Sequence, residues 1–197
     1  MVKVYVGEGE YEEEFIIPKP EIDRRPSLSD PQIGCTTMMN DGTLKLDSPC
    51  FRSFHPDDFR FVAEFLSTGK FGRSFVAHDN EEGKREMFAE CAVTWAIADR
   101  LVLEDLLDHI VAKIQQTRPW GMVETWWFAK TVYQTEGSAL EAYTVMKDMI
   151  AEAIADDFHE LAIAYGSEFI GPLRELPELQ RDVYKRLTAK AEAKLEE

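Results

Sequence analysis

One stretch in the first half of the chain carries a complete helix signal, with a start, an apolar face and an end. Pro56 stands in the first turn, where a missing N–H group costs nothing, and Asp57 and Asp58 lie at the positive end of the helix dipole. Apolar residues then recur at helical spacing, namely Phe59, Val62, Ala63 and Leu66. Gly69 follows, where helices commonly end on a left-handed residue. The sequence therefore predicts a helix over 56–68.

A second stretch predicts two helices joined by a tight turn. Trp95 and Ala98 lie on one side of the first helix, which we place at 86–99. The turn follows at 100–103. The next helix, at 103–116, carries an apolar stripe made of Leu103, Leu106, Leu107, Ile110, Val111 and Ile114. A stripe of this length predicts that the second helix is packed into a core.

The N-terminus predicts a β-hairpin. Val2, Val4 and Val6 alternate with polar neighbours, which is the period-two pattern of a half-buried strand. The glycine-rich segment 7–9 turns the chain, and 13–17 returns as the second strand.

The segment 18–49 has a weaker pattern. Prolines punctuate it, so helices there are at most short. The residues 43–46 alternate in polarity again and predict the next strand.

Taken in order, these pieces resemble the BTB/POZ family, particularly its fungal branch. In that family the first of these helices ends in a Tyr-Thr-Gly-like turn, and the next helical pair carries Ala-Asp-Lys/Arg-Leu. Here Thr68-Gly69 and Ala98-Asp99-Arg100-Leu101 fit this pattern, while Ser67 stands in place of the tyrosine. The resemblance covers most of residues 1–117.

The resemblance implies an α+β fold, in which residues 1–117 form a BTB/POZ-like domain with a small sheet of about three strands covered by helices. Residues 118–197 would follow as a helical extension packed on that domain. We expect the two parts to unfold together, because the connector between them is short. Family members usually carry two helices between the hairpin and the third strand. Too few residues remain for both within 18–49, so we expect the second helix to be shortened or lost.

The C-terminal extension predicts further helices. Residues 121–134 carry a tryptophan-rich helical pattern. Ser138-Ala139-Leu140-Glu141 has the form of a capping box that opens a long helix reaching Leu161. A last helix is expected from Pro177 to Glu197.

Composition and charge exclude several classes of protein. The formal net charge of −15 argues against nucleic-acid binding, because a phosphate-binding surface needs clustered Lys and Arg. We expect no membrane span, since no apolar run approaches the roughly 20 residues that cross a bilayer. Cys35, Cys50 and Cys91 are odd in number and far apart, which argues against a disulfide framework. We therefore expect an intracellular protein of the nucleus or cytoplasm.

The search for catalytic and metal-binding chemistry yields no candidate. The histidines are dispersed, and none has a cysteine at the spacing of metal ligands. Cys91 is interpreted as a small core residue, because no base accompanies it. Val6-Gly7-Glu8-Gly9 lacks the third glycine and the following helix of a dinucleotide-binding turn. We therefore assign no catalytic, cofactor-binding or metal-binding residue and interpret the chain as not an enzyme.

Trp126 and Trp127 admit two interpretations. Adjacent residues on a helix point about 100° apart, so one apolar stripe cannot easily bury both. Either the helix is wedged between two layers and buries both rings, or one tryptophan faces a second chain, where Trp is a favoured anchor. The first interpretation is the main one, because most large aromatic side chains serve the core of their own domain.

The predicted function is a non-catalytic, BTB/POZ-type protein–protein interaction module that acts as a self-associating scaffold or assembly subunit. We expect a homodimer formed by helix faces or a sheet edge, with the segment 18–49 and the face carrying Trp126 or Trp127 as candidates. A swapped N-terminal strand is not expected, because the hairpin begins at Val2.

The resemblance leaves a second function, that of a substrate adaptor of a cullin-based ubiquitin ligase, and a catalytic function comes third. Cullin-binding relatives present a hydrophobic-x-Glu motif before the third strand. The nearest equivalent here is Met39-Asn40-Asp41, whose acid is shorter. We therefore expect weak cullin binding, with Met39 and Asp41 as the residues that would contact the partner.

Overall fold

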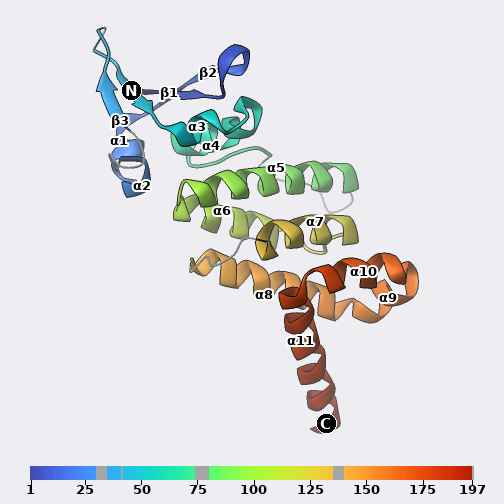
Figure 1. The fold of residues 1–197 in the computed structure, drawn as a ribbon. Helices are drawn as coiled ribbons and strands as arrows, with labels where there is room; N and C mark the ends of the chain where they lie inside the picture. The colour runs from blue at the N-terminus through green and yellow to red at the C-terminus, as the bar shows by residue number, and fades with distance from the viewer. Residues whose placement is uncertain (30–34, 41, 74–79, 135–139, 197) are drawn as a thin grey trace. The chain divides into compact units, whose positions relative to one another are not determined.

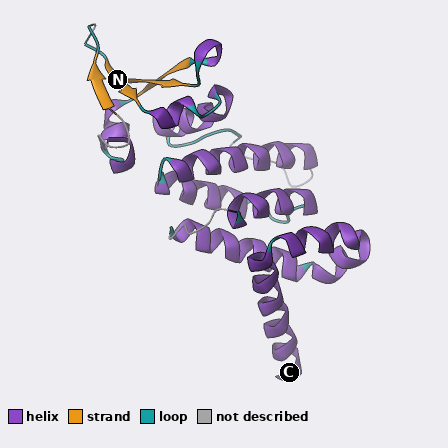
Figure 2. Ribbon diagram, viewed as in Figure 1, coloured by secondary structure: helices purple, strands orange, loops and turns teal. Residues whose placement is uncertain are grey.

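The chain divides into two compact units, Met1–Ile110 and Val111–Glu197. The computed structural model describes residues 1–29, 35–40, 42–73, 80–134 and 140–196 (Figure 1). Among these residues the strands belong to the first unit, and the second unit is helical (Figure 2). The boundary between the units falls inside the helix α6, Glu104–Gln115. The mixed α and β content agrees with the predicted fold class.

The described part of the first unit contains one four-stranded sheet in the order β2-β1-β4-β3. Its strands are β1 (Val2–Val6), β2 (Glu13–Ile17), β3 (Cys35–Met38) and β4 (Leu44–Asp47). β1 pairs antiparallel with β2 and parallel with β4, so that Val4 stands between Phe15 and Leu46. The predicted N-terminal hairpin is confirmed, and the predicted strand at 43–46 lies one residue later.

The expectation of about three strands missed β3. This strand pairs antiparallel with β4, and the turn between them is closed by the Met39 amide, which donates to the Thr43 carbonyl at 2.7 Å. Gly42 has the positive φ of 78° that a tight hairpin favours. The prolines before β3 hid the strand, because they made the whole segment look irregular.

Two short helices, α1 (Lys19–Asp23) and α2 (Pro26–Ser29), occupy the described part of the proline-rich segment. Their lengths agree with the expectation that prolines permit only short helices there. Ile22 and Leu28 are nonetheless buried, so each helix places an apolar side chain in the core of the first unit.

The sheet buries one face through strict alternation. Val2, Val4 and Val6 are buried, whereas Lys3 and Tyr5 lie on the opposite face. On that opposite face the Tyr5 hydroxyl donates to the Glu14 carboxylate at 2.7 Å, and Lys3 lies 3.3 Å from the same carboxylate. The acidic hydrogen-bond acceptor raises the pKa of Tyr5.

The helix α4 (Pro56–Thr68) has the predicted bounds, and it follows the short helix α3 (Pro49–Arg52). Phe59 of α4 packs between aromatic rings of the first unit, with its ring centroid 5.2 Å from that of Phe15 and 5.7 Å from that of Phe51. Gly69 ends the helix with a φ of 74°, the left-handed conformation expected at this position.

The helix α5 (Glu81–Arg100) begins five residues earlier than its predicted start at 86. Asn80 caps it, because its side-chain oxygen accepts a hydrogen bond from the Gly83 amide at 2.9 Å. The predicted turn between α5 and α6 is confirmed, and the Leu103 amide donates to the Ala98 carbonyl at 2.8 Å across it. Val102 in this turn has a φ of 52°.

The second unit contains the helices α7 (Met122–Tyr133), α8 (Glu141–Asp156), α9 (Phe158–Tyr165), α10 (Ser167–Glu175) and α11 (Pro177–Glu196). α8 packs against both α7 and α11. Among the described side chains, α8 is joined to α11 by the ion pairs Lys147–Glu178, Asp148–Arg186 and Asp156–Lys190.

Two predictions for the second unit are wrong. The capping box would start a helix at Ser138, but the residue preceding α8 is Leu140, and Glu141 is the first helical residue; Ser138 itself lies outside the described residues. The long helix predicted to reach Leu161 ends at Asp156, and α9 starts two residues later. The apolar spacing continues across this break, which is why periodicity alone did not reveal it.

Candidate functional site

The two adjacent tryptophans of α7 lie in different environments. Trp126 is only 8% exposed, and its ring centroid lies 5.6 Å from that of Phe169. Trp127 is 49% exposed. Successive positions of a helix point about 100° apart, which accounts for this separation. The structure therefore buries the first ring and presents the second to solvent.

Val123 extends the exposed apolar surface around Trp127. It lies four residues earlier on α7, hence on the same face of the helix, and it is 54% exposed. We call Val123 and Trp127 the α7 stripe. The i, i+4 spacing of these two residues was the signal in the sequence that could have added Val123 to the candidates.

The core of the second unit holds the buried side of α7. Phe128, Ala129 and Val132 are buried, as is most of Tyr133. The single proton of the Tyr133 hydroxyl is shared between two acceptors, the Lys147 carbonyl at 3.1 Å and the Asp182 carboxylate at 3.3 Å, which links α7 to α8 and α11. These contacts fix the rotation of α7 about its axis within the second unit. The position of Trp127 is therefore set by the core behind it.

Met39, one of the two predicted cullin-contact residues, lies at the turn between β3 and β4. Met39 is exposed there, and its neighbour Met38 is exposed as well. Asp41 lies outside the described residues, so no position is assigned to its carboxylate. Of the two candidates, Met39 and Asp41, only Met39 therefore has a described position, and it is exposed.

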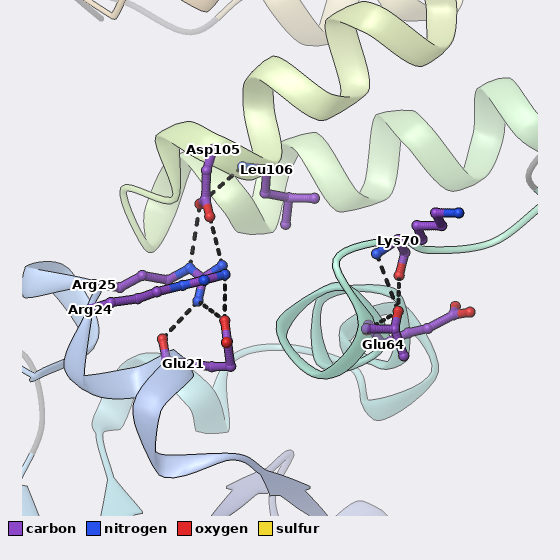
Figure 3. Close-up of polar contacts among 8 residues, drawn as sticks. Glu21, Arg24, Arg25, Glu64, Lys70, Asp105 and Leu106 are labelled. Carbon is purple, nitrogen blue, oxygen red and sulfur yellow. Dashed lines mark hydrogen bonds and ion pairs between the residues drawn. The ribbon is translucent and has the colours of Figure 1, made fainter.

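Arg25 is a residue that sequence reasoning missed. Its side chain is only 6% exposed, yet its charge is fully engaged. One terminal nitrogen of its guanidinium donates to the Asp105 carboxylate at 2.6 Å, and the other donates to the Glu21 carbonyl at 2.7 Å and to the Glu21 carboxylate at 3.0 Å (Figure 3). The guanidinium also lies 5.8 Å from the centroid of the Phe65 ring.

This network bears on the segment 18–49, which was a candidate for a dimer interface. A lost helix in this segment would uncover side chains of the core. In the described part of the segment, Arg25 ties α1 and α2 to the first turn of α6, and Ile22 and Leu28 are buried. These two helices therefore cover the core of their own unit, and the α7 stripe is the stronger candidate surface.

The described residues offer little for chemistry. None of their His, Cys, Asp and Glu side chains form a group of three that could hold a metal ion. Cys91 is fully buried in α5, as its interpretation as a core residue predicted. The His109 ring packs between Phe65 and Phe71, at centroid distances of 5.3 and 5.7 Å. None of the described helices is long and apolar enough to span a bilayer.

The comparisons with known proteins give no guide to the function of these surfaces. No family model, no curated protein and no solved structure matches this chain.

Proposed function

We propose that this chain is a non-catalytic protein–protein interaction module of the BTB/POZ kind, acting as a self-associating scaffold or assembly subunit. The observation that carries the proposal is the half-exposed Trp127 on a helix whose opposite side is packed into the second unit. A large aromatic ring in water is unfavourable for an isolated chain and is typical of interface anchors.

The order of elements in the first unit supports the BTB/POZ part of the proposal. A β-hairpin comes first, two short helices follow, and β4 then lies parallel to β1. α4 ends at Thr68 with Gly69 in the left-handed conformation, and the turn after Arg100 joins α5 to α6. The hairpin, the end of α4 and the turn between α5 and α6 are the places where the sequence resembles the family.

The α7 stripe favours a symmetric homodimer. In a two-fold interface the same patch meets itself, so Trp127 of one copy would pack near Trp127 of the other, with Val123 beside it. A stable interface buries on the order of 1,600 Å², more than these side chains supply alone. The stripe would therefore be the apolar centre of a contact whose rim includes polar neighbours such as Lys130 and Gln134, both exposed.

Light scattering of the full chain at several concentrations tests the proposal. A homodimer predicts a mass that rises from that of one chain, 22.6 kDa, toward twice this value as the concentration increases. A mass that stays at one chain up to high micromolar concentration would exclude the homodimer and would leave a different protein as the partner.

The alternative function, a cullin adaptor, has the exposed pair Met38 and Met39 in its favour. An aspartate at position 41 is shorter than the glutamate of cullin-binding relatives. We therefore expect binding to a purified cullin N-terminal domain to be weaker than micromolar. Sub-micromolar binding would support the adaptor function instead.

A further inference from the structure

The second unit contains a partly open cavity that the proposed function does not use. Its volume is about 340 Å³, within the range of small-molecule sites. It is formed by the segment before α7, the start of α7, the end of α8, and α9 and α10. All of these belong to the second unit.

The walls of the cavity are mainly apolar and well supported. Trp126 and Phe169 line it, and their rings contact each other at a centroid distance of 5.6 Å. Met122, Ile154 and Leu161 complete the apolar lining. Phe169 is fully buried and is also packed against Phe158, at 5.4 Å between ring centroids, so this wall is held from behind.

Two of the three charged side chains in the lining are already neutralised. Arg118 donates to the Met149 carbonyl and pairs with the Glu152 carboxylate, both at 3.2 Å. Its guanidinium lies 4.9 Å from the centroid of the Trp120 ring. Asp156 is paired with Lys190 of α11.

Asp157 is the charge that remains. It lines the cavity at the break between α8 and α9, it is exposed, and its carboxylate has no hydrogen-bond or ion-pair partner among the described residues. The charged side chains of the lining, taken with their ion-pair partners, therefore leave one net negative charge beside an apolar, aromatic space.

We propose that this cavity binds a small organic cation, an ammonium group carried on an apolar body. The apolar body would fill the space between Trp126 and Leu161, and the ammonium group would pair with the Asp157 carboxylate. Aromatic rings add to this preference, because the face of Trp attracts a cation. The stacking of Arg118 on Trp120 is an internal example of the same attraction.

The negative charge of the site disfavours organic anions and gives neutral molecules no ion pair. An organic anion of the same size would face the unpaired carboxylate of Asp157. Its approach would also be opposed by the net charge of −15. A neutral molecule would gain the apolar contacts but no ion pair.

Three probes with nearly the same body separate these classes, namely 2-phenylethylammonium, 2-phenylethanol and 3-phenylpropanoate. Binding to the full chain would be measured by calorimetry, with the indole N–H signals of ¹⁵N-labelled protein used to locate it. A ligand of this size predicts a dissociation constant of about 1 mM for the ammonium. We expect the alcohol to bind about threefold more weakly, as suits an exposed ion pair, and the propanoate more weakly still.

Two variants test the assignment of the site. Asp157→Asn keeps a residue suited to a helix start. It should reduce the affinity for the ammonium to the level of the affinity for the alcohol. The affinity for the alcohol itself should stay unchanged. Ala153→Leu adds bulk to the cavity lining and should abolish binding of all three probes. Ala164→Leu, at an exposed position of α9 outside the lining, serves as the control.

Failure of the proposal has clear forms. It is overturned if no binding of the ammonium is detected at a ligand concentration 10-fold above the expected dissociation constant. It is equally overturned if the propanoate binds as tightly as the ammonium. It is also overturned if Asp157→Asn leaves the preference for the ammonium intact. None of these outcomes bears on self-association, which light scattering tests separately.

Discussion

Arg25 and Asp105 are 80 positions apart in the sequence and form a two-point ion pair inside the first unit. The second of the two hydrogen bonds is long, at 3.4 Å between the Arg25 Nε and the Asp105 carboxylate. Because the arginine side chain is buried and the aspartate is about half exposed, the two partners are not equivalent. Loss of the aspartate leaves Glu21 to compensate the guanidinium, whereas loss of the arginine removes the whole network.

Arg25→Met is therefore expected to lower the free energy of unfolding by about 2 kcal/mol, and Asp105→Asn by about 1 kcal/mol. Urea unfolding measures both. Lys19→Met, which removes an exposed pair with Asp23, serves as the control and should cost less than about 0.5 kcal/mol. An Arg25→Met variant as stable as the control would mean that the network contributes no stability.

Gly7 and Gly9 provide a matched pair in the β1–β2 connection. Both have a positive φ, 90° and 63°. A Cβ atom at position 7 would lie 2.5 Å from the Tyr11 carbonyl oxygen, whereas a Cβ atom at position 9 would meet nothing within 4 Å. Gly9→Ala should cost about 1 kcal/mol for conformation alone. Gly7→Ala should cost at least about 2 kcal/mol more, because the backbone must also shift.

The comparison of the two unfolding free energies checks this prediction. Equal losses for the two substitutions would show that the connection relaxes freely and that the close approach at Gly7 carries no strain.

The sequence predicted best where several local signals agreed. The helix α4 has a proline start, acidic residues in its first turn, an apolar face and a glycine end, and its bounds were correct. The start of α5 was placed too late, because its first turn, Glu81 to Lys84, is polar and shows no periodicity. Asn80 as a cap was the signal that could have corrected it.

The elements that were missed depend on partners distant in the chain. β3 is defined by its pairing with β4, although the Asp41-Gly42 dipeptide was a hairpin signal available in the sequence. The burial and ion pairing of Arg25 could not be predicted, because its neighbours in the sequence do not distinguish a buried arginine from a solvent-exposed one. The adjacent positions of Trp126 and Trp127 on a helix predicted that the two rings lie on different faces. Which ring is buried depends on the packing of Trp126 against Phe169, which the sequence does not reveal.

Tyr133 predicts a pH dependence. Burial, together with the neighbouring Asp182 carboxylate, raises the pKa of Tyr133 far above its ordinary value of 10.0. The folded chain thus holds this proton more tightly than the unfolded chain does. Tyr133 contributes stability that is fully present below about pH 10 and is lost progressively as the pH rises above that value.

Unfolding measured between about pH 8 and about pH 11 should therefore show a steeper loss of stability for the wild-type chain than for Tyr133→Phe. At neutral pH the substitution should cost about 1 kcal/mol, because the hydroxyl proton is shared between the Lys147 carbonyl and the Asp182 carboxylate. Parallel pH profiles would contradict the raised pKa of Tyr133.

The two tryptophans should differ sharply in their effect on stability. Trp126→Ala removes a buried ring packed on Phe169 and should cost about 3 kcal/mol or more. Trp127→Ala removes a ring that is half exposed and should cost less than about 1 kcal/mol in dilute, monomeric samples. Thermal or urea unfolding at low concentration decides the point, and equal losses would mean that Trp127 serves the core.

Sedimentation equilibrium of Trp127→Ala beside the wild-type chain tests the proposed interaction surface most directly. Tyr165→Ala, which removes another exposed aromatic ring of the second unit, is the matched control. We predict that the wild type and the control dimerise with the same constant, and that Trp127→Ala dimerises at least about tenfold more weakly, as expected for an interface anchor. Equal dimerisation of all three proteins, or a wild type that remains at 22.6 kDa throughout, would contradict the account.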